Sequence, residues 1–295
     1  SNVTNMENMF RNANALTDGN KCLIHASFSS NVNWSYDWSG SGYCGTYVPD
    51  DNFEQALIDL GYDDVLDDSV LTANIMGVTD LVLNSKEISD LTGIEAFTAL
   101  TNLLLENNQL TNLDVGSNTA LEQLNIGMNQ ITSLDVSNNT ALTNLLLEDN
   151  QLTSLDVSNN AALTWLDCQK NNLTSLDVSD NTALTYLHCY YNDLTSLDVS
   201  NNTALNHLSI TWNQVTSLDV SNNTALTYLG LGHNQLDTLD VSNNTALVGL
   251  YCNENNLDRL DLSNHTALTW LDCHSNGLSY LNMRNGVTDQ LTTFE

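Results

Sequence analysis

Aromatic and histidine side chains recur at intervals of 21 residues in the second half of the chain, for example at Trp165, Tyr186, His207 and Tyr228. Surface Tyr and Trp residues dominate the binding energy of many interfaces, because each combines a large apolar ring with a hydrogen-bonding group. Side chains of these types are suited to binding a ligand and, by themselves, not to catalysing a reaction. The sequence therefore predicts one ligand-binding surface with these candidate residues: Trp165, Tyr186, His188, Tyr190, Tyr191, His207, Trp212, Tyr228, His233, Tyr251, Trp270 and Asp272.

No catalytic motif accompanies these residues. The chain contains no HExxH, GxxxxGK or GxSxG sequence and no EF-hand loop. We therefore expect no enzyme activity, no bound cofactor and no metal at this surface. The net charge of −30, from 36 acidic and 6 basic side chains, also argues against nucleic acid as a partner, since phosphate contacts require Lys and Arg.

A column of aspartates is the most regular polar feature of the sequence. Between Leu and Val in the motif LDV, each carboxylate should point away from the core. Carboxylates about 5 Å apart repel one another by about 0.8 kcal/mol per adjacent pair in water, so each needs a compensating group. Hydrogen bonds from the serine two residues later and from backbone N–H groups are the first hypothesis, and a row of Ca²⁺ ions is the second. The column consists of Asp114, Asp135, Asp156, Asp177, Asp198, Asp219, Asp240 and Asp261.

Both columns belong to a repeat of 21 residues. Nine blocks fill residues 98–286 without an insertion or deletion, and the block 182–202 reads TALTYLHCYYNDLTSLDVSNN. Each block contains the pattern LxxLxLxxNxL, in which alternate apolar residues predict a short strand, and no part of a block is long enough for a full helix. Stacked coils of this kind form a solenoid, with a parallel sheet on the concave side and a mostly extended convex side made of extended or short-strand segments.

The blocks resemble the irregular 21-residue class of bacterial leucine-rich repeats, LxxLxLxxNxLxxLDLxxNxx. This resemblance implies an α/β horseshoe fold, a right-handed leucine-rich-repeat solenoid with little helix outside an N-terminal cap. The period predicts buried columns that begin at Leu100, Leu103, Leu105 and Leu110. Asn108 and its equivalents should form a buried ladder, because a buried amide must bond to the backbone of the turns.

We predict that residues 48–97 form a cap over the first coil, because the core and the sheet edge of that coil would otherwise be exposed. The segment VPDDNFEQALIDLG predicts a helix that begins after Asp50 or Asp51, ends at Gly61, and places Leu60 on its buried face together with Phe53, Ala56 and Leu57. The following VTDLVLNSKEISDLTGIEAF is similar to the 22-residue repeat of internalin-like surface proteins, and the whole segment resembles their N-terminal caps.

The two ends of the chain differ from the repeats. Residues 1–47 begin with SNVTNMENMFRNANAL, which resembles the end of a lipoprotein-type bacterial surface repeat, and are interpreted as the end of an upstream domain. Residues 287–295 are interpreted as a truncated final coil.

The six cysteines fall into two sets. Cys22 and Cys44 lie outside the repeats in a segment rich in Gly and Ser, and a disulfide between them would suit an exported protein. The other four occupy one buried strand column and are predicted to be small core residues: Cys168, Cys189, Cys252 and Cys273.

The resemblances imply export to the bacterial cell surface or the extracellular space, and adhesion or recognition there. A protein or peptide partner bound by the concave face is our first hypothesis. Carbohydrate binding through the same aromatic strip is the alternative, and a structural spacer without a ligand is the third. No apolar stretch approaches the roughly 20 residues needed to cross a bilayer, so we expect no membrane insertion by this chain.

Overall fold

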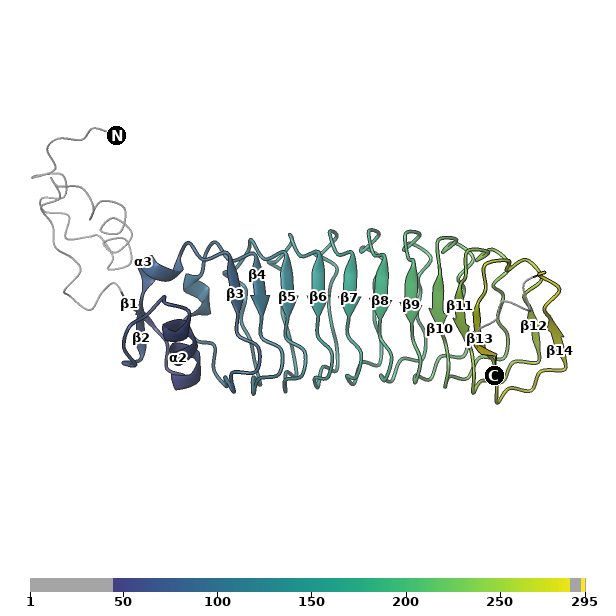
Figure 1. Cartoon of the computed structure of the whole chain (residues 1–295), viewed down its shortest axis with the longest axis horizontal. Coiled ribbons are helices and arrows are strands. Elements are labelled where there is room, and N and C mark those ends of the chain that lie inside the picture. The colour runs from purple at the N-terminus through teal and green to yellow at the C-terminus, as the bar shows by residue number, and fades with distance from the viewer. Residues whose placement is uncertain (1–44, 287–292, 295) are drawn as a thin grey trace, which may run out of the picture.

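The chain forms an elongated solenoid of stacked coils that begins with a small helical cap (Figure 1). A computed structural model describes residues 45–286 and 293–294, so the predicted disulfide between Cys22 and Cys44 falls outside the described residues. The elements of the cap and the first repeat are β1 (Gly45–Tyr47), α2 (Asp51–Asp59), β2 (Ser69–Leu71), α3 (Thr72–Ile75), β3 (Asp80–Val82) and the 3₁₀ helix η1 (Ile94–Ala96). The strands that follow are β4 (Asn102–Leu104), β5 (Gln123–Asn125), β6 (Asn144–Leu146), β7 (Trp165–Asp167), β8 (Tyr186–His188), β9 (His207–Ser209), β10 (Tyr228–Gly230), β11 (Gly249–Tyr251), β12 (Arg259–Asp261), β13 (Trp270–Asp272), β14 (Tyr280–Asn282) and β15 (Thr293–Phe294).

Eleven of these strands form one parallel sheet, in the order β3-β4-β5-β6-β7-β8-β9-β10-β11-β13-β15. Within the repeats each strand residue pairs with the residue one block later, as Tyr186 does with His207 and Tyr228 with Gly249. The 21-residue period of the sequence predicts this register. The predicted solenoid with a parallel sheet is therefore confirmed.

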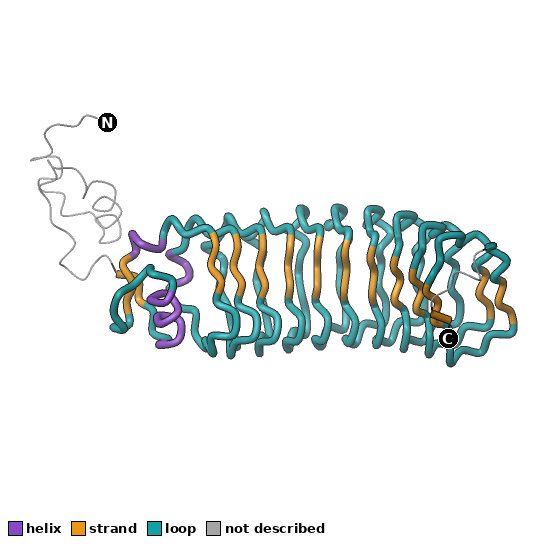
Figure 2. Tube along the Cα trace, viewed as in Figure 1, coloured by secondary structure: helices purple, strands orange, loops and turns teal. Residues whose placement is uncertain are grey.

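Outside the sheet the coils consist almost entirely of loop (Figure 2). Among the described residues, helix is confined to α2, α3 and η1 in the cap and first repeat, as predicted. The strands β12 and β14 form a second, two-stranded parallel sheet on the convex side of the last described coils, where the sequence predicted extended or short-strand segments. None of the described helices has the length and hydropathy that a membrane span requires.

Asp50 is the N-cap residue of helix α2, which settles the choice between the two candidates Asp50 and Asp51. Its Oδ1 accepts hydrogen bonds of 3.0 Å from the backbone N–H groups of Asn52 and Phe53, at the start of α2. Its Oδ2 accepts bonds of 2.8 and 2.9 Å from the N–H groups of Ser89 and Asp90, in the first repeat. Burial by itself would raise the pKa of Asp50, but these bonds outweigh it and lower the pKa. One carboxylate thus joins the cap to the solenoid.

The cap departs from the sequence prediction at one position. Phe53, Ala56 and Leu57 are buried as expected, but Leu60 is 46% exposed. Leu60 is the C-terminal capping residue of α2, and Gly61 follows it with a left-handed φ of 80°. The chain turns away there, so Leu60 lies beyond the packed turns of the helix.

The predicted ladder that starts at Asn108 is fully bonded and is buried as far as Asn255, while its last member, Asn276, is half-buried. Asn192 is typical: its Oδ1 accepts a bond of 2.9 Å from Leu173 N–H, in the coil before. Its Nδ2 donates to the carbonyl oxygens of Cys168 and Cys189, at 3.0 and 3.1 Å. Each amide therefore links two neighbouring coils, and the members from Asn108 to Asn255 are only 7–9% exposed.

A second asparagine ladder, which the sequence analysis missed, lies at the last residue of each block. Asn202 donates from Nδ2 to the carbonyl oxygens of Val178 and Asn181, both at 2.9 Å. Its Oδ1 is buried without a partner within the described residues, as in the other members. The sequence signal for this ladder was the Asn that ends each block, which in five of the seven blocks is the second Asn of SNN: Asn118, Asn139, Asn160, Asn181, Asn202, Asn223 and Asn244.

His265 takes the place of asparagine in the next coil. Its Nε2 lies 3.1 Å from the carbonyl oxygen of Val241, the position that an asparagine Nδ2 would occupy. The side chain is fully buried and its Nδ1 has no partner within the described residues. Burial lowers the pKa of His265, so the neutral ring with its proton on Nε2 continues the ladder.

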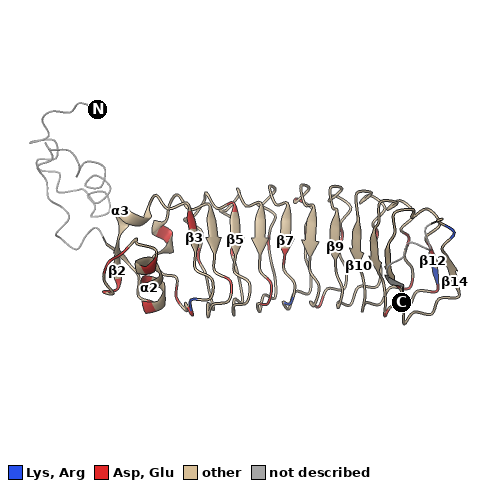
Figure 3. Cartoon of the chain, viewed as in Figure 1, with Lys and Arg blue, Asp and Glu red and all other residues tan. Residues whose placement is uncertain are grey.

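The aspartate column lies exposed on the convex side, and acidic residues recur along the whole described solenoid (Figure 3). Each of the eight carboxylates accepts a hydrogen bond from the backbone N–H two residues later, as the first hypothesis predicted. The Ser158 hydroxyl and N–H together lower the pKa of Asp156, and the corresponding serines lower the pKa of the column members from Asp135 to Asp261. Serines and turn backbones therefore hold these carboxylates in the ionised state.

Candidate ligand-binding face

The concave sheet places the candidate side chains in columns. In β8 the central Leu187 is buried, while Tyr186 and His188 on either side of it project from the opposite face. Because the sheet is parallel and in register, residues one block apart lie next to each other, at about 4.8 Å. That spacing is close to the thickness of stacked rings, so aromatic residues in one column can stack.

Four rings form a continuous stack along β7 to β10. Trp165, Tyr186, His207 and Tyr228 follow one another with ring centroids 4.0, 4.4 and 4.0 Å apart and interplanar angles of 26°, 19° and 6°. Tyr251 continues the stack from the next column, with its ring tilted by 36° at 5.3 Å from Tyr228.

Three further rings stack at the turn that follows the strands. Tyr191, Trp212 and His233 have centroids 5.2 and 3.6 Å apart and interplanar angles of 9° and 15°. Each has a left-handed φ between 52° and 58°, and the equivalent residues of the remaining blocks have φ between 51° and 59°. A left-handed conformation costs a residue other than glycine about 1 kcal/mol or more, so the turn itself is strained in every coil. Only these three coils use the position for an aromatic ring or histidine.

His188 and Tyr190 connect the two stacks. The ring of His188 lies 4.3 Å from Tyr186 and 4.9 Å from His207. Tyr190 lies 5.6 Å from His188 and 5.7 Å from Tyr191. Ten of the twelve predicted site residues therefore form one connected surface, here called the aromatic network: Trp165, Tyr186, His188, Tyr190, Tyr191, His207, Trp212, Tyr228, His233 and Tyr251.

The other two predicted residues lie beside this network. Trp270 is 50% exposed and its neighbour in the sheet is Gly249, which carries no ring. The rings of Tyr228 and Tyr251 fill the space over Gly249, where a Cβ would lie 3.3–3.4 Å from them. Asp272 contacts His274 and belongs to a polar cluster that adjoins the network at His233.

The network is accessible, although most of its rings cover one another. Trp165, Tyr191 and Trp212 are 39%, 45% and 44% exposed, high values for such large apolar side chains. The stacked rings turn their faces toward their neighbours along the solenoid. Their edges, hydroxyl groups and ring N–H groups are therefore the parts that solvent or a ligand can reach.

Asp167 lies beneath the first part of the network and is only 8% exposed. Its carboxylate accepts bonds of 3.2 and 3.0 Å from the backbone and side-chain nitrogens of Gln169, and His188 Nδ1 lies 3.6 Å away. Burial, aided by the charge of Asp167, raises the pKa of Tyr186 to about 12 and also raises that of Tyr190. Both hydroxyls therefore stay protonated and can donate hydrogen bonds at neutral pH.

His207 is held neutral inside the first stack. Burial is the main cause that lowers the pKa of His207 to about 4, and the nearby His188 is the second cause. A neutral imidazole stacks between Tyr186 and Tyr228 without bringing a charge into the stack.

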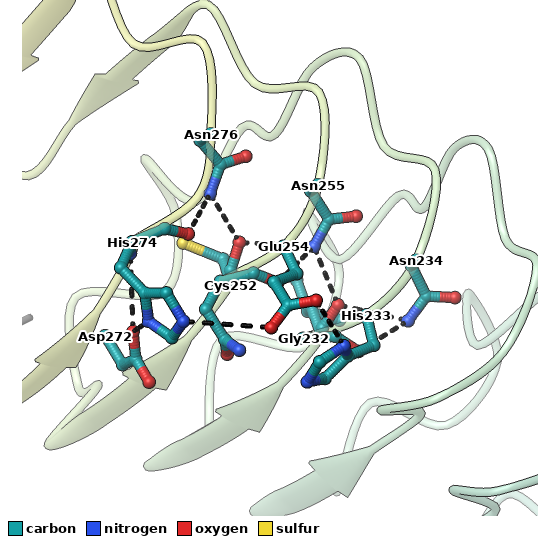
Figure 4. Close-up of polar contacts among 11 residues, drawn as sticks. Gly232, His233, Asn234, Cys252, Glu254, Asn255, Asp272, His274 and Asn276 are labelled. Atoms are coloured by element: carbon teal, nitrogen blue, oxygen red, sulfur yellow. Dashed lines mark hydrogen bonds and ion pairs between the residues drawn. The ribbon is translucent and has the colours of Figure 1, made fainter.

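A polar cluster adjoins the C-terminal side of the network (Figure 4). Nδ1 of His233 lies 2.8 Å from one carboxylate oxygen of Glu254, and Nε2 of His274 lies 3.9 Å from the other. His274 in turn contacts Asp272 through Nδ1 at 2.5 Å. Glu254 and His274 were not among the predicted residues, although both belong to the same sequence columns as network members. Within the described part of the chain, no group of three or more His, Cys, Asp and Glu side chains could hold a metal ion.

Known structures share this architecture. The functional domain of InlJ from Listeria monocytogenes, whose description includes a cysteine ladder, aligns with a TM-score of 0.79 and 39% sequence identity over 83% of this chain. The chain is a leucine-rich-repeat protein. A leucine-rich-repeat protein of Leptospira interrogans aligns over 75% of the chain with a TM-score of 0.68 and 25% identity. Internalin C2 of Listeria monocytogenes, with a TM-score of 0.52 and 18% identity over 85% of this chain and 93% of its own, shares the fold.

The structural neighbours of this leucine-rich-repeat protein are thus bacterial and internalin-like. It spans 54% of the InlJ domain and 61% of the Leptospira protein. No protein-family model matches the chain, and no curated protein sequence does.

The leucine-rich-repeat protein also contains two short cysteine columns. Cys168 and Cys189 lie on adjacent coils, as do Cys252 and Cys273, and all four are free and buried. Burial raises the pKa of each thiol, so they stay protonated core residues, as the sequence predicted.

Proposed function

We propose that this chain is a non-enzymatic binding module of an exported bacterial surface protein, and that its aromatic network binds a protein or peptide partner. One observation carries the proposal: ten rings join on the solvent side of a sheet whose core is complete without them. The core leucines Leu166, Leu187 and Leu208 are fully buried on the other side. Exposed clusters of Tyr and Trp of this kind supply the binding energy of protein interfaces.

The chain itself provides a comparison that argues against a simple spacer. In β4, β5 and β6 the column that later holds the rings contains Asn102, Gln123 and Asn144. These coils have the same register and the same buried leucines. The fold therefore does not require the rings, and their concentration over β7 to β11 calls for another reason.

The orientation of the rings favours a protein over a sugar. A sugar ring stacks on an open aromatic face, whereas the inner rings of the network turn their faces toward each other at 4.0–4.4 Å. What they offer a ligand is ring edges together with the protonated hydroxyls of Tyr186, Tyr190 and Tyr228. Such a surface suits backbone carbonyls and apolar side chains.

The extent of the network suits a protein ligand as well. From Trp165 to Tyr251 it covers five coils, or about 20 Å along the solenoid at the usual strand spacing. A stable protein interface buries about 800 Å² per partner, which a face of this length and the adjoining loops can supply. The similarity to InlJ supports a role at the bacterial surface.

The test is a binding screen with matched variants. The chain is screened against arrays of extracellular proteins, peptides and glycans, and each hit is measured again with Tyr186→Ala and Tyr228→Ala. Each variant should weaken binding of a protein or peptide by about 1–3 kcal/mol, the range of hot-spot truncations, while Asp198→Asn on the convex side leaves it unchanged. Hits that are only glycans would support the carbohydrate alternative. Protein binding that survives both tyrosine variants and is lost in Asp198→Asn would place the site on the convex face.

A further inference from the structure

Positive charge is absent from the outward columns of the concave sheet, and the turn column of Tyr191 contains one basic residue, Lys170. The outward positions of β4 to β11 and β13, and those immediately after each strand, contain no Lys or Arg. Of the described basic residues, Lys86 pairs with Asp59 at the cap and Lys170 lies 3.9 Å from Asp149 at a turn. Arg259 stacks over the ring of Tyr280, in the sheet of β12 and β14.

Carboxylates instead flank the aromatic network at both ends. Glu148 and Asp167 lie at its N-terminal side, and Glu254 and Asp272 lie at its C-terminal side. These carboxylates affect the rings. Burial is the main cause that raises the pKa of Tyr190 and of Tyr251. The charges of Asp167 and Glu148 raise the pKa of Tyr190 further, and the charge of Asp272 raises that of Tyr251 further. The two ends of the network, around Tyr190 and Tyr251, thus lie in a negative potential.

The ionised carboxylate of Glu148 lies in an environment on the sheet that disfavours its charge. Its carboxylate fills the space above Gly127, where a Cβ would lie 2.5 Å from the Glu148 Cδ. One of its oxygens, Oε2, is buried and has no hydrogen-bond partner within the described residues. Burial raises its pKa, and repulsion from Asp167 and Glu106 adds to the effect. A cation at this position would supply the missing donor and relieve the repulsion.

We propose that the partner bound by the aromatic network is a cationic protein segment, and that a Lys or Arg side chain of this segment binds between Glu148 and Asp167 beside Tyr190. This inference rests on the proposed function and names the chemistry of the partner. The apolar stem of the basic side chain packs along the ring edges while its charged head reaches the two carboxylates. Complementary charge also speeds the encounter with such a segment and disfavours acidic partners.

The experiment uses a phage-displayed library of random dodecapeptides, selected on the wild-type chain at physiological ionic strength. Selected peptides should be enriched in Lys and Arg over the unselected library. Synthetic peptides are then compared with counterparts in which each Arg is citrulline, a neutral side chain of nearly the same shape, and each Lys is norleucine. Affinity should fall at least about tenfold on this neutralisation, the loss expected when a desolvated charge pair is broken.

Matched variants separate this site from the general charge of the chain. Glu148→Gln with Asp167→Asn, and Asp177→Asn with Asp198→Asn on the convex side, change the net charge by the same amount. The concave pair should weaken binding of the basic peptides at least about tenfold and the convex pair by less than about twofold. Equal losses in both pairs would mean nonspecific attraction to an acidic protein and would overturn the proposal. A loss of binding in CaCl₂, but not in NaCl of equal ionic strength, would instead assign the carboxylates to a divalent cation.

Failure of this inference and failure of the proposed function give different results. If neutral and basic peptides bind equally well and both are lost in Tyr186→Ala, the network binds peptides without selecting charge, and only the cationic partner is excluded. If selected peptides bind regardless of Tyr186→Ala and of the concave pair, both proposals fail. Thermal unfolding of each variant at pH 7 confirms that the losses are not due to misfolding.

Discussion

The rings of Trp212 and His233 stack with centroids 3.6 Å apart and an interplanar angle of 15°, although both residues lie in turns outside the strands. Their backbones share a left-handed conformation, with φ of 58° and 52°, that the repeat imposes on every coil. The N–H of Trp212 still donates to the Gly232 carbonyl at 2.9 Å, so the ladder of the sheet extends into the turn. The stack of Tyr191, Trp212 and His233 therefore forms because each coil has the same left-handed turn at the same position.

His207 should titrate far below a free histidine. In an NMR titration its ring resonances should change near pH 4, because burial and the adjacent His188 both disfavour the proton. Since its pKa in the folded state lies below the unfolded value of about 6.5, the stability it contributes is complete above pH 6.5 and is lost as the pH falls toward 4. His188→Gln should raise the pKa of His207. Titration of His207 near 6.5 in the wild type would mean that its ring is not enclosed in the stack.

Asn192→Leu should destabilise the solenoid by about 1–3 kcal/mol, the cost of leaving buried partners unbonded. The substitution removes the acceptor of Leu173 N–H and the donor to the carbonyl oxygens of Cys168 and Cys189. Chemical denaturation measures the loss. Asn201→Leu, at an exposed convex position, is the control and should change stability by less than about 0.5 kcal/mol. Equal effects would contradict the ladder.

His265→Asn should stabilise the protein and flatten its response to mild acid. His265 contacts one carbonyl oxygen, that of Val241, whereas Asn244 donates to two in the preceding coil, those of Val220 and Asn223. Asparagine at 265 therefore adds a second hydrogen bond and removes a buried group that can take up a proton. The pKa of His265 is lowered in the folded state, so wild-type stability is lost as the pH falls below about 6.5. Melting temperatures from pH 7.5 to about 5 should therefore diverge, with the variant falling less. Parallel curves would show that His265 does not control this response.

Glu148→Gln should leave the protein as stable at pH 7 as the wild type, or more stable. The pKa of Glu148 is raised by burial and by repulsion from Asp167, so its ionised form costs stability at neutral pH. That cost disappears as the pH falls below the unfolded value of about 4.3, where the advantage of the variant should vanish. Glu122→Gln, at an exposed position, should show no such pH-dependent difference. A clear loss of stability in Glu148→Gln at pH 7 would mean that this carboxylate has a structural partner.

The fold could be predicted from the sequence because the 21-residue period of the repeats determines which residues of neighbouring strands pair. Leu103, Leu124 and Leu145 repeat at 21 residues and lie side by side in the sheet. The helix after Asp50 was also foreseen, since its capping residues are local. Short convex strands were expected as one possibility, but the sequence could not show that only β12 and β14 would pair, because the spacing of the leucines is the same in the coils whose convex side is loop.

The candidate site could be predicted only as a set of columns. The sequence shows which residues face the concave side, but not that Tyr228 leans over Gly249 and leaves Trp270 apart, since ring orientation depends on the neighbouring coil. For the same reason the contact of Glu254 with His233 and His274 was missed. The Asn202 ladder went unnoticed because the first Asn of SNN, which is exposed, looks identical in sequence.

Hydroxyl-radical footprinting with and without a bound partner or selected peptide tests the central claim most directly, because Trp and Tyr side chains are among its highly reactive targets. Mass spectrometry would read out Trp165, Tyr191 and Trp212 on the concave face, which are 39%, 45% and 44% exposed. Tyr47 in the cap, 61% exposed, and Tyr280 in β14 serve as internal references. If the aromatic network is the binding surface, the ligand should protect the three concave residues and leave Tyr47 and Tyr280 as reactive as before. Protection of Tyr47 or Tyr280, with Trp165, Tyr191 and Trp212 unchanged, would contradict the account.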